Sequence, residues 1–434
     1  MPDILPFSGI RYNPLVVHDM VRVVAPPYDV IDPEQHQELL DADPYNCVRL
    51  ILGSSPGRPG DYQREADRMA QWLSEGILIR DPAPRFYLIE DAFQLAGEPS
   101  PRRRWGIIGR VRLESLDSGR IHPHERTHSG PKEDRLRLMK AFRGNLSQVF
   151  ALFDGDSAGI KAALGGVFDS PPALDITDRE GIGRRMWVID DSGLVDSISE
   201  QLSRRNLYIA DGHHRYETAL AYSQEMALAD REAGPDMGYR FVAMALVGLE
   251  DPGLAILPTH RLLHSLDGFD FSRLTGCLAE SFALDDVEPE DGESIRAGSA
   301  PDDGIGRGFI LYDPSKDRLV RATLREDVDL AARMPDLPQP VRELDVTLAE
   351  RMVMMDCLGM TPEQISHQEN LEYFKDVRKA MEKARSQGQV LIIMRPTGIS
   401  DLIAVTGARE RMPQKSTFFF PKMLSGVVFY PHDP

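Results

Sequence analysis

The hydrophobic pattern near the middle of the first half predicts paired β-strands. Residues 85–94 and 104–115 are rich in β-branched and aromatic side chains. The linker between them contains Gly and Pro, which suit a turn or a longer hairpin loop. We therefore expect the two runs to form antiparallel strands.

Two segments before these strands carry the pattern of amphipathic helices. Asp32 followed by Pro33 is typical of a helix start, with a side-chain cap and a proline at the first helical position. In residues 61–76, Met69, Trp72 and Leu73 share one helical face before Gly76. We expect a helix in each segment.

The later part of the chain mixes strands and helices. Residues 207–210 predict a short strand, followed by an Asp-Gly turn and a helix, and residues 241–249 predict another strand. Eight acidic residues and one arginine between positions 285 and 304 predict a surface loop. Strands at 308–313 and 390–396, helices at 346–358 and 373–387, and an aromatic end at 416–430 follow. The fold class expected is α+β or mixed α/β.

Length and this alternation suggest several folding units. At about 150 residues per domain, 434 residues predict two or three domains. We expect an N-terminal α+β domain at 1–150, a phosphate-binding module at 151–284, an acidic loop at 285–304 and a C-terminal α+β region at 305–434.

Composition excludes some functions. Fifty basic residues against 68 acidic ones give a net charge of −18, which disfavours binding to nucleic acid or to an anionic membrane. Cys47, Cys277 and Cys357 lie far apart in the sequence, so we expect neither a disulfide framework nor a zinc knuckle. Without an export signal or a membrane-spanning run, we expect a cytoplasmic protein. The oligomeric state is not predicted.

The most informative run is residues 210–219, ADGHHRYETA. A strand that passes through Asp211 and Gly212 into a helix leaves first-turn N–H groups available for an anion. His213, His214 and Arg215 add donors suited to phosphate. The alternative is that Asp211 merely caps a helix whose end lies in solvent.

A second cluster lies in residues 121–135. Three histidines, His122, His124 and His128, surround Glu125 in a loop that leads to a helix. Their spacing does not match a zinc-binding helix, and a contact with phosphate or Mg²⁺ is favoured over tight zinc binding. The groups that could make it are Glu125, Lys132 and Asp134. A solvated loop is the alternative.

Two further runs offer charged groups. Residues 411–422 contain Lys415 and Lys422 but lack the glycines of a phosphate loop, so the lysines could reach an anion only from beside a pocket. Residues 25–32, APPYDVID, form a stiff bend that could present Asp29 to a cleft. The alternative for residues 411–422 is that the phenylalanines belong to the core and the lysines face solvent. The alternative for residues 25–32 is a rigid connector with no functional role.

The run LYIADGHHRYETAL resembles the signature shared by ParB partition proteins, sulfiredoxin and free-serine kinases. The resemblance implies a strand-turn-helix module that binds nucleotide phosphates. Over its whole length the chain resembles the uncharacterised DUF1015 family, through APPYDVI, HERTHSGPKEDR, ADGHHRYETAL, LPTHR and MPQKSTFFFPK. The form with two histidines is most similar to the serine kinases, which implies phosphoryl transfer on a free amino acid.

These features predict a phosphoryl-transfer enzyme, running as a kinase or a phosphatase on a small amino acid such as serine or phosphoserine. Phosphate would bind at Gly212 to Arg215 with Lys132, Lys415 and Lys422, and Asp211, His213, Glu125 or Asp29 would act in catalysis. Mg²⁺ on Glu125 and Asp134, with ATP or ADP, would complete the site. The alternatives are a nucleotide-binding regulator and a metal-dependent hydrolase using His122, His124 and His128.

Overall fold

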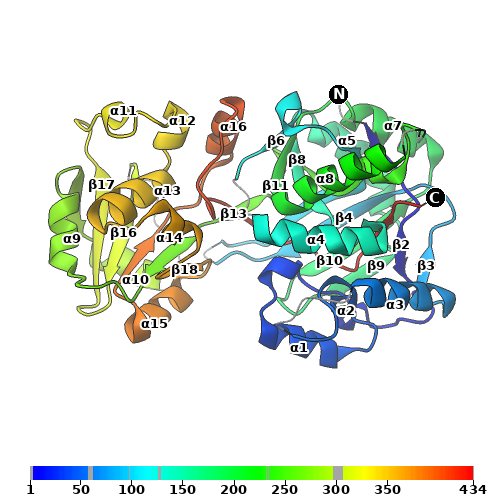
Figure 1. Cartoon of the computed structure of the whole chain (residues 1–434), viewed down its shortest axis with the longest axis horizontal. Helices are drawn as coiled ribbons and strands as arrows, with labels where there is room; N and C mark the ends of the chain where they lie inside the picture. The colour runs from blue at the N-terminus through cyan, green and yellow to red at the C-terminus, as the bar shows by residue number, and fades with distance from the viewer. Residues whose placement is uncertain are drawn as a thin grey trace.

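Two β-sheets divide the chain into a larger and a smaller lobe (Figure 1). The computed structural model describes residues 3–56, 62–96, 98–125, 129–230, 232, 234–296 and 306–433. The larger lobe holds a nine-stranded sheet and the smaller lobe a six-stranded sheet. Helices and strands are mixed in both, so the expected α+β class is confirmed.

The nine-stranded sheet of the larger lobe is mixed. Its order is β6 (Ile121–Pro123), β11 (Leu207–Asp211), β8 (Val149–Phe153), β12 (Phe241–Gly248), β5 (Arg102–Arg112), β4 (Phe86–Phe93), β10 (Gly183–Ile189) and β9 (Leu174–Thr177), with β1 (Ile4–Leu5) on β5. The predicted antiparallel pairing of β4 with β5 is confirmed. Every residue of β12 is buried, which explains its unbroken apolar run.

The smaller lobe and three short ribbons contain the other strands. The six-stranded order is β15 (Phe282–Asp286), β17 (Arg318–Leu324), β16 (Gly308–Asp313), β19 (Val390–Ile393), β14 (His260–Leu263) and β18 (Leu371–Phe374). The ribbons are β2 (Ile10–Tyr12) with β3 (Leu78–Arg80), β13 (Ala255–Leu257) with β20 (Phe418–Phe420), and β7 (Gly144–Asn145) with β21 (Tyr430–Pro431).

Helices cover the sheets of both lobes, with α4 and α8 lying side by side on the larger one (Figure 1). In the larger lobe the helices are α1 (Pro33–Ala42), α2 (Val48–Ile51), α3 (Tyr62–Ser74), α4 (Ser129–Phe142), α5 (Ser157–Ala163), α6 (Gly165–Phe168), α7 (Ser192–Leu202) and α8 (His213–Ala229). The rest are α9 (Phe271–Leu278), α10 (Pro289–Arg296), α11 (Leu330–Arg333), α12 (Gln339–Arg342), α13 (Asp345–Leu348), α14 (Pro362–Ser366), α15 (Val377–Gln387) and α16 (Ile399–Gly407). The single turns are η1 (Met20–Arg22), η2 (Tyr28–Val30), η3 (Leu116–Ser118) and η4 (Gly238–Arg240), and η6 (Ala349–Cys357) is a π-helix.

The two early helices follow their sequence signals. The Asp32 side chain accepts a hydrogen bond of 2.8 Å from the Gln35 N–H, so α1 begins as predicted. In α3, Trp72 is buried, and Gly76 follows with a φ of +73° that favours glycine. Both predictions are confirmed.

Long-range pairing departs from several expectations. Strands from both sides of residue 150 share the larger sheet, and strands from both sides of the acidic stretch share the smaller one. That stretch was predicted as a loop, but Pro289–Arg296 form α10, which buries Ile295. The helix predicted at 373–387 begins at Val377, because Tyr373 belongs to β18.

The expectation of no disulfide is also wrong. Cys277 in α9 is bonded to Cys357 at the end of η6, across 80 residues of sequence. The two helices pack against each other in the smaller lobe. Spacing along the chain therefore gave no sign of the pair, while Cys47 is free and buried as a small apolar side chain.

The last segment of the chain returns from the smaller lobe to the larger one. After α16, Phe418–Phe420 pair with β13, and Tyr430–Pro431 pair with β7. Both labelled ends of the chain consequently lie on the larger lobe (Figure 1). This return brings residues 412–431 against strands that precede them by 161 residues (Leu257 and Phe418) to 287 residues (Gly144 and Pro431).

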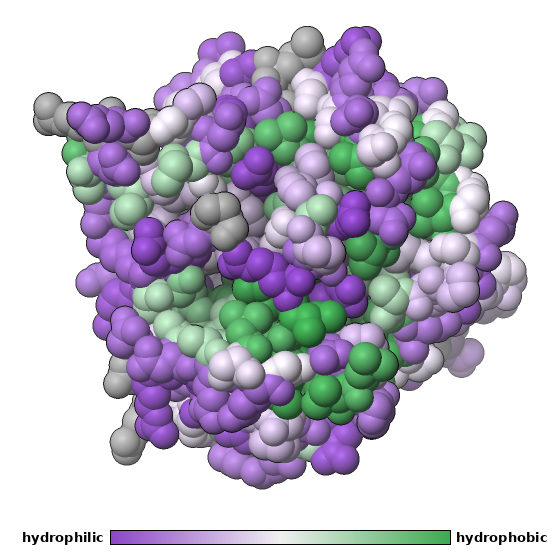
Figure 2. Space-filling model, turned by 90° about the vertical axis from the view of Figure 1, so that its right-hand side faces the viewer, coloured by the Kyte–Doolittle hydropathy of each residue, from purple (hydrophilic) through white to green (hydrophobic). Residues whose placement is uncertain are grey.

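The end of the larger lobe away from the smaller lobe is largely hydrophilic, with hydrophobic residues gathered around a hollow (Figure 2). A groove of about 200 Å³ lies between α3 and α4, where it is lined by Leu73, Phe142 and Phe429. Among the described residues, no helix is both long and apolar enough to cross a bilayer.

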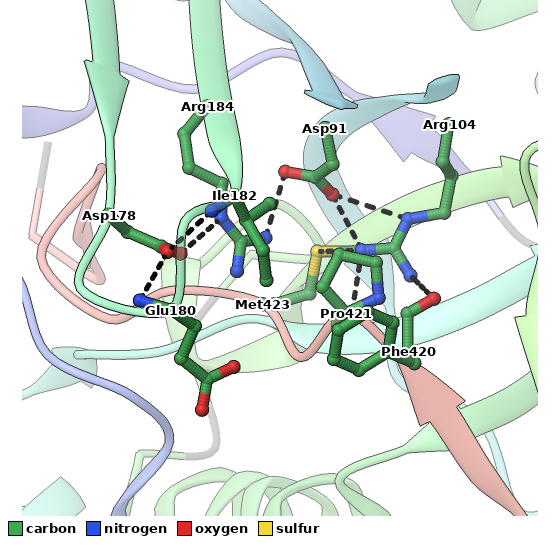
Figure 3. A network of polar contacts seen from close by, with 9 residues as sticks. All are labelled: Asp91, Arg104, Asp178, Glu180, Ile182, Arg184, Phe420, Pro421 and Met423. Atoms are coloured by element: carbon green, nitrogen blue, oxygen red, sulfur yellow. Dashed lines mark hydrogen bonds and ion pairs between the residues drawn. The ribbon is translucent and has the colours of Figure 1, made fainter. Parts of the chain in front are cut away.

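A buried ionic network fixes the returning segment (Figure 3). The Asp91 carboxylate binds Arg104 at 2.6 Å and Arg184 at 2.9 Å, and Arg184 also binds Asp178 at 2.8 Å. Burial opposes ionisation of Asp91, but Arg184 and Arg104 outweigh it and lower its pKa. Arg104 also donates to the carbonyls of Phe420 at 3.3 Å and Pro421 at 2.7 Å.

Replacing Arg104 tests the importance of this network. Arg104→Met leaves part of the Asp91 charge and two carbonyls without their buried donor, so it should lower the free energy of unfolding by about 3 kcal/mol. The neighbouring Arg103, with a side chain 59% exposed and paired with Glu90, is the control. Arg103→Met should cost no more than about 1 kcal/mol. Urea unfolding measures both, and equal losses would contradict the assignment.

Candidate functional site

A one-residue turn at Gly212 connects the end of β11 directly to the N-terminus of α8. Gly212 has a φ of +89° and accepts the first helical hydrogen bond from the Tyr216 N–H. This φ favours glycine, and a Cβ at Gly212 would also lie 2.9 Å from the Arg215 guanidinium and force that side chain to shift. Within the described residues no side chain caps α8, which contradicts the alternative that Asp211 is the cap.

Asp211 is the hub of the charges at this turn. Its Oδ2 binds Arg215 at 2.8 Å, and its Oδ1 binds the Lys422 ammonium at 2.8 Å. Burial alone would raise the pKa of Asp211, but Lys422 and Arg215 hold it well below its usual range. Asp211 is therefore an ionised carboxylate with both oxygens engaged, which suits orientation better than proton abstraction.

Arg215 is held in the protein and does not project into solvent. It is 8% exposed, and its guanidinium donates to the Gln148 carbonyl as well as to Asp211. The sequence pattern predicts that the Arg215 guanidinium binds phosphate directly. The observed contacts instead make Arg215 the group that fixes Asp211, and through it Lys422.

Two buried histidines lie beside the turn with their rings 4.7 Å apart. The Nδ1 of His124 lies 2.7 Å from the Ile209 carbonyl, which makes it the donor, and Nε2 accepts from the Thr417 hydroxyl at 2.7 Å. The Nε2 of His213 accepts from the His124 N–H at 3.3 Å. Burial lowers the pKa of both residues, so both rings are neutral near pH 7.

These contacts argue against the histidine metal cluster. Both ring nitrogens of His124 are engaged, and His122 stacks on Tyr208 with ring centres 4.9 Å apart. His128 lies outside the described residues. Within the part of the chain that is described, no three His, Cys, Asp or Glu side chains form a group that could hold a metal.

The Glu125 loop and the returning C-terminal segment meet at the same place. Glu125 Oε1 lies 3.4 Å from both the N–H and the hydroxyl of Thr417. The backbone of Glu125 forms an isolated parallel β-bridge with that of Met412. Lys132 and Arg411 both form ion pairs with Glu217 of α8. Residues from three distant parts of the sequence therefore surround the start of α8.

The other predicted site residues lie further out. Asp29 is exposed, and its neighbour Tyr28 lines the same small cavity as Arg215, so η2 lies near the turn. Asp134 accepts from the Tyr62 hydroxyl at 2.9 Å and pairs with Arg135, so its oxygens are engaged elsewhere. Lys415 is exposed, and its carbonyl accepts from Arg261. His214 is half-buried in the first turn.

Sequence reasoning missed two residues of the cluster. Thr417 completes the hydrogen bonding of His124, and its place beside Lys415 in the KST run is a usable signal for it. Gln148 contributes through its backbone carbonyl, which any residue carries. No pattern of side chains could have identified that contact.

The neutral histidines generate a pH prediction. An unfolded histidine takes up a proton near pH 6.5, whereas the folded pKa values of His124 and His213 are lower, so stability is full above pH 6.5 and falls below it. We expect the free energy of unfolding to drop by at least about 1 kcal/mol between pH 7.5 and 5.0. His124→Gln, which keeps a donor and an acceptor, should flatten this slope in urea titrations, whereas the exposed His367→Gln should not. Equal slopes would count against the neutral histidine.

Comparison with solved structures gave distant likenesses. A mutant free serine kinase in complex with ADP is 11% identical, with 72% of this chain and 87% of that chain covered and a TM-score of 0.34. SbnI from Staphylococcus aureus, truncated at its C-terminus, is 12% identical with 73% and 85% covered and a TM-score of 0.34. A conserved hypothetical protein from Pyrococcus furiosus is 12% identical, with 73% and 92% covered and a TM-score of 0.32.

Comparison with curated proteins gave no match. A family profile described as "Protein of unknown function (DUF1015)" matches residues 4–347. The match includes the Glu125 loop and the β11–α8 turn, and it ends before Thr417 and Lys422. It spans well over half of the chain, and the protein therefore belongs to the DUF1015 family.

Proposed function

We propose that this protein is a phosphoryl-transfer enzyme that binds phosphate at the N-terminus of α8. The observation that carries the proposal is the uncapped start of this 17-residue helix within the described structure, with the Lys422 ammonium beside it on Asp211. The first-turn N–H groups and the positive end of the helix dipole favour an anion. Gly212 lets a phosphate approach the backbone closely.

Each neighbouring group has a separate part in this proposal. Lys422 offsets the phosphate charge, and Arg215 holds Asp211 so that Lys422 stays at the turn. His213 is neutral near pH 7, which makes it a hydrogen-bond partner and not a source of protons. Lys132 and Lys415 remain proposed as secondary phosphate contacts.

Glu125 is the proposed general base. Its side chain is 20% exposed beside Thr417, whereas both oxygens of Asp211 are already bound. The base takes the proton of the acceptor hydroxyl, whose oxygen then bonds to phosphorus as the bond to the leaving group breaks with its electron pair. Asp29 is the second candidate, because its neighbour Tyr28 lines the same small cavity as Arg215.

The proposed acceptor is a small hydroxy amino acid such as free serine, with phosphoserine as the substrate of the reverse or hydrolytic reaction. This choice rests on the DGHHR signature and its resemblance to serine kinases. ATP or ADP would be the phosphate donor or product. Because Glu125 acts as the base, Mg²⁺ would be held mainly by the phosphates of the ligand; Asp134 does not fit as a ligand because Tyr62 and Arg135 bind it. When bound, Mg²⁺ would neutralise phosphate charge.

Product formation gives the direct test. Purified protein with ATP, Mg²⁺ and serine should give phosphoserine and ADP in ³¹P NMR spectra, and Glu125→Gln should cut turnover at least ~100-fold with little change in ligand affinity. Phosphoserine alone should give phosphate if the enzyme is a phosphatase. Binding of ATP without either product would contradict the enzyme and favour a nucleotide-binding regulator.

A lysine exchange tests the phosphate site itself. Lys422→Met removes the ammonium at the turn, and we expect about a tenfold or greater loss of affinity for inorganic phosphate, read by calorimetry. Lys140 of α4 provides the matched control, because its ammonium also pairs with a carboxylate of α8, that of Glu225, at 2.7 Å. Lys140→Met should bind phosphate as the unmodified protein does. If both variants bind equally, phosphate does not lie at the turn.

A further inference from the structure

A pocket of about 350 Å³ lies between the two lobes, next to the α8 turn but outside it. Part of the lining comes from the bend before η2 and from α1, and part comes from β20. Residues of β18 in the smaller lobe close a third side. The volume suits a small organic molecule and exceeds what a bare phosphate needs.

The two main walls are apolar and partly aromatic. Val24, Pro26 and Val30 line the pocket together with Phe418 and Phe420. Phe418 and Phe420 alternate with the fully buried Phe419, so the strand directs them to the same side. Such a slot favours a flat or apolar body over a hydrated amino acid.

The charge of the pocket is opposite to that of the whole chain. The net charge of the protein is −18, yet five basic and two acidic residues occur among the described residues that line the pocket. The basic residues are Arg179, Arg184, Lys375, Lys415 and Lys422, and the acidic ones are Asp178 and Glu180. Asp91 and Asp211, which lie outside the lining, balance Arg184 and Lys422, and Glu180 pairs with Lys375. Arg179 and Lys415 are the cations that favour an anionic group on the ligand.

Lys422 belongs to both places. Its ammonium lies 2.8 Å from Asp211 at the α8 turn and 4.5 Å from the Phe418 ring, and Lys422 also lines the pocket. The buried pairing of Asp178 with Arg184 and the Arg104 contact with Phe420 fix the pocket wall (Figure 3). One ligand could thus place an anionic group at the turn and its body in the pocket.

We propose that this pocket binds the flat, apolar body of a small organic anion whose anionic group reaches Lys422. The inference rests on the proposed phosphate site for the position of the anionic group. The ligand chemistry could come from a nucleoside phosphate or from an aromatic acid. A phosphate ester with no flat body, such as phosphoserine, would leave the pocket unfilled.

An exposed valine and a matched isoleucine allow a clean test. Val30 is 42% exposed in the pocket, and Ile403, on α16 outside the pocket, is 41% exposed. The probes are 8-anilinonaphthalene-1-sulfonate, read by fluorescence, and AMP and inorganic phosphate, read by calorimetry. Val30→Asp places a negative charge in the wall and should weaken binding of the naphthalene probe about tenfold, whereas Ile403→Asp should not change it.

AMP distinguishes the sources and separates the two proposals. If the ligand is a nucleoside phosphate, AMP should bind more tightly than phosphate, and Val30→Asp should remove that advantage without changing phosphate binding. If it is an aromatic acid, AMP and phosphate should bind alike and the naphthalene probe should still depend on Val30. Equal binding of every probe by the Val30→Asp and Ile403→Asp variants would overturn the pocket assignment. Phosphate binding that is unchanged by Gly212→Ala would overturn the α8 site alone.

Discussion

The buried carboxylate of Asp91 is the constraint from which the candidate site is built. It neutralises Arg104 and Arg184, and Arg104 in turn binds two successive carbonyls, those of Phe420 and Pro421. Those carbonyls immediately precede Lys422, whose ammonium reaches Asp211. A charge in the core of the larger sheet thus determines where a cation lies at the helix N-terminus. Burying these charged groups costs desolvation energy, but the network fixes the position of the Lys422 ammonium.

Local features could be predicted from sequence because neighbouring residues determine them. The cap at Asp32, the β4–β5 hairpin and the β11–α8 turn all depend on residues close together in the chain. The acidic stretch and Tyr373 were misjudged because partners far along the sequence decide their structure. Propensity gives way to such tertiary contacts.

The candidate site shows the same division. Asp211, Gly212 and Arg215 were found together because they share one turn, but the pattern could not show that Arg215 is occupied by Gln148. The pairing of Thr417 with His124 joins residues 293 positions apart. The disulfide between Cys277 and Cys357 likewise joins residues 80 positions apart, which their spacing does not indicate. Separation along the chain says little about distance once two sheets have formed.

The return of residues 412–431 to the larger lobe sets an order of events during synthesis. Both sheets draw their strands from residues before 394, so they can form on the ribosome before the last segment emerges. Thr417 and Lys422 arrive afterwards and join a turn at Asp211 that was made two hundred residues earlier. Both sheets can therefore form while the start of α8 still lacks its cation, and the ion pair between Asp211 and Lys422 forms only after residue 422 has been made.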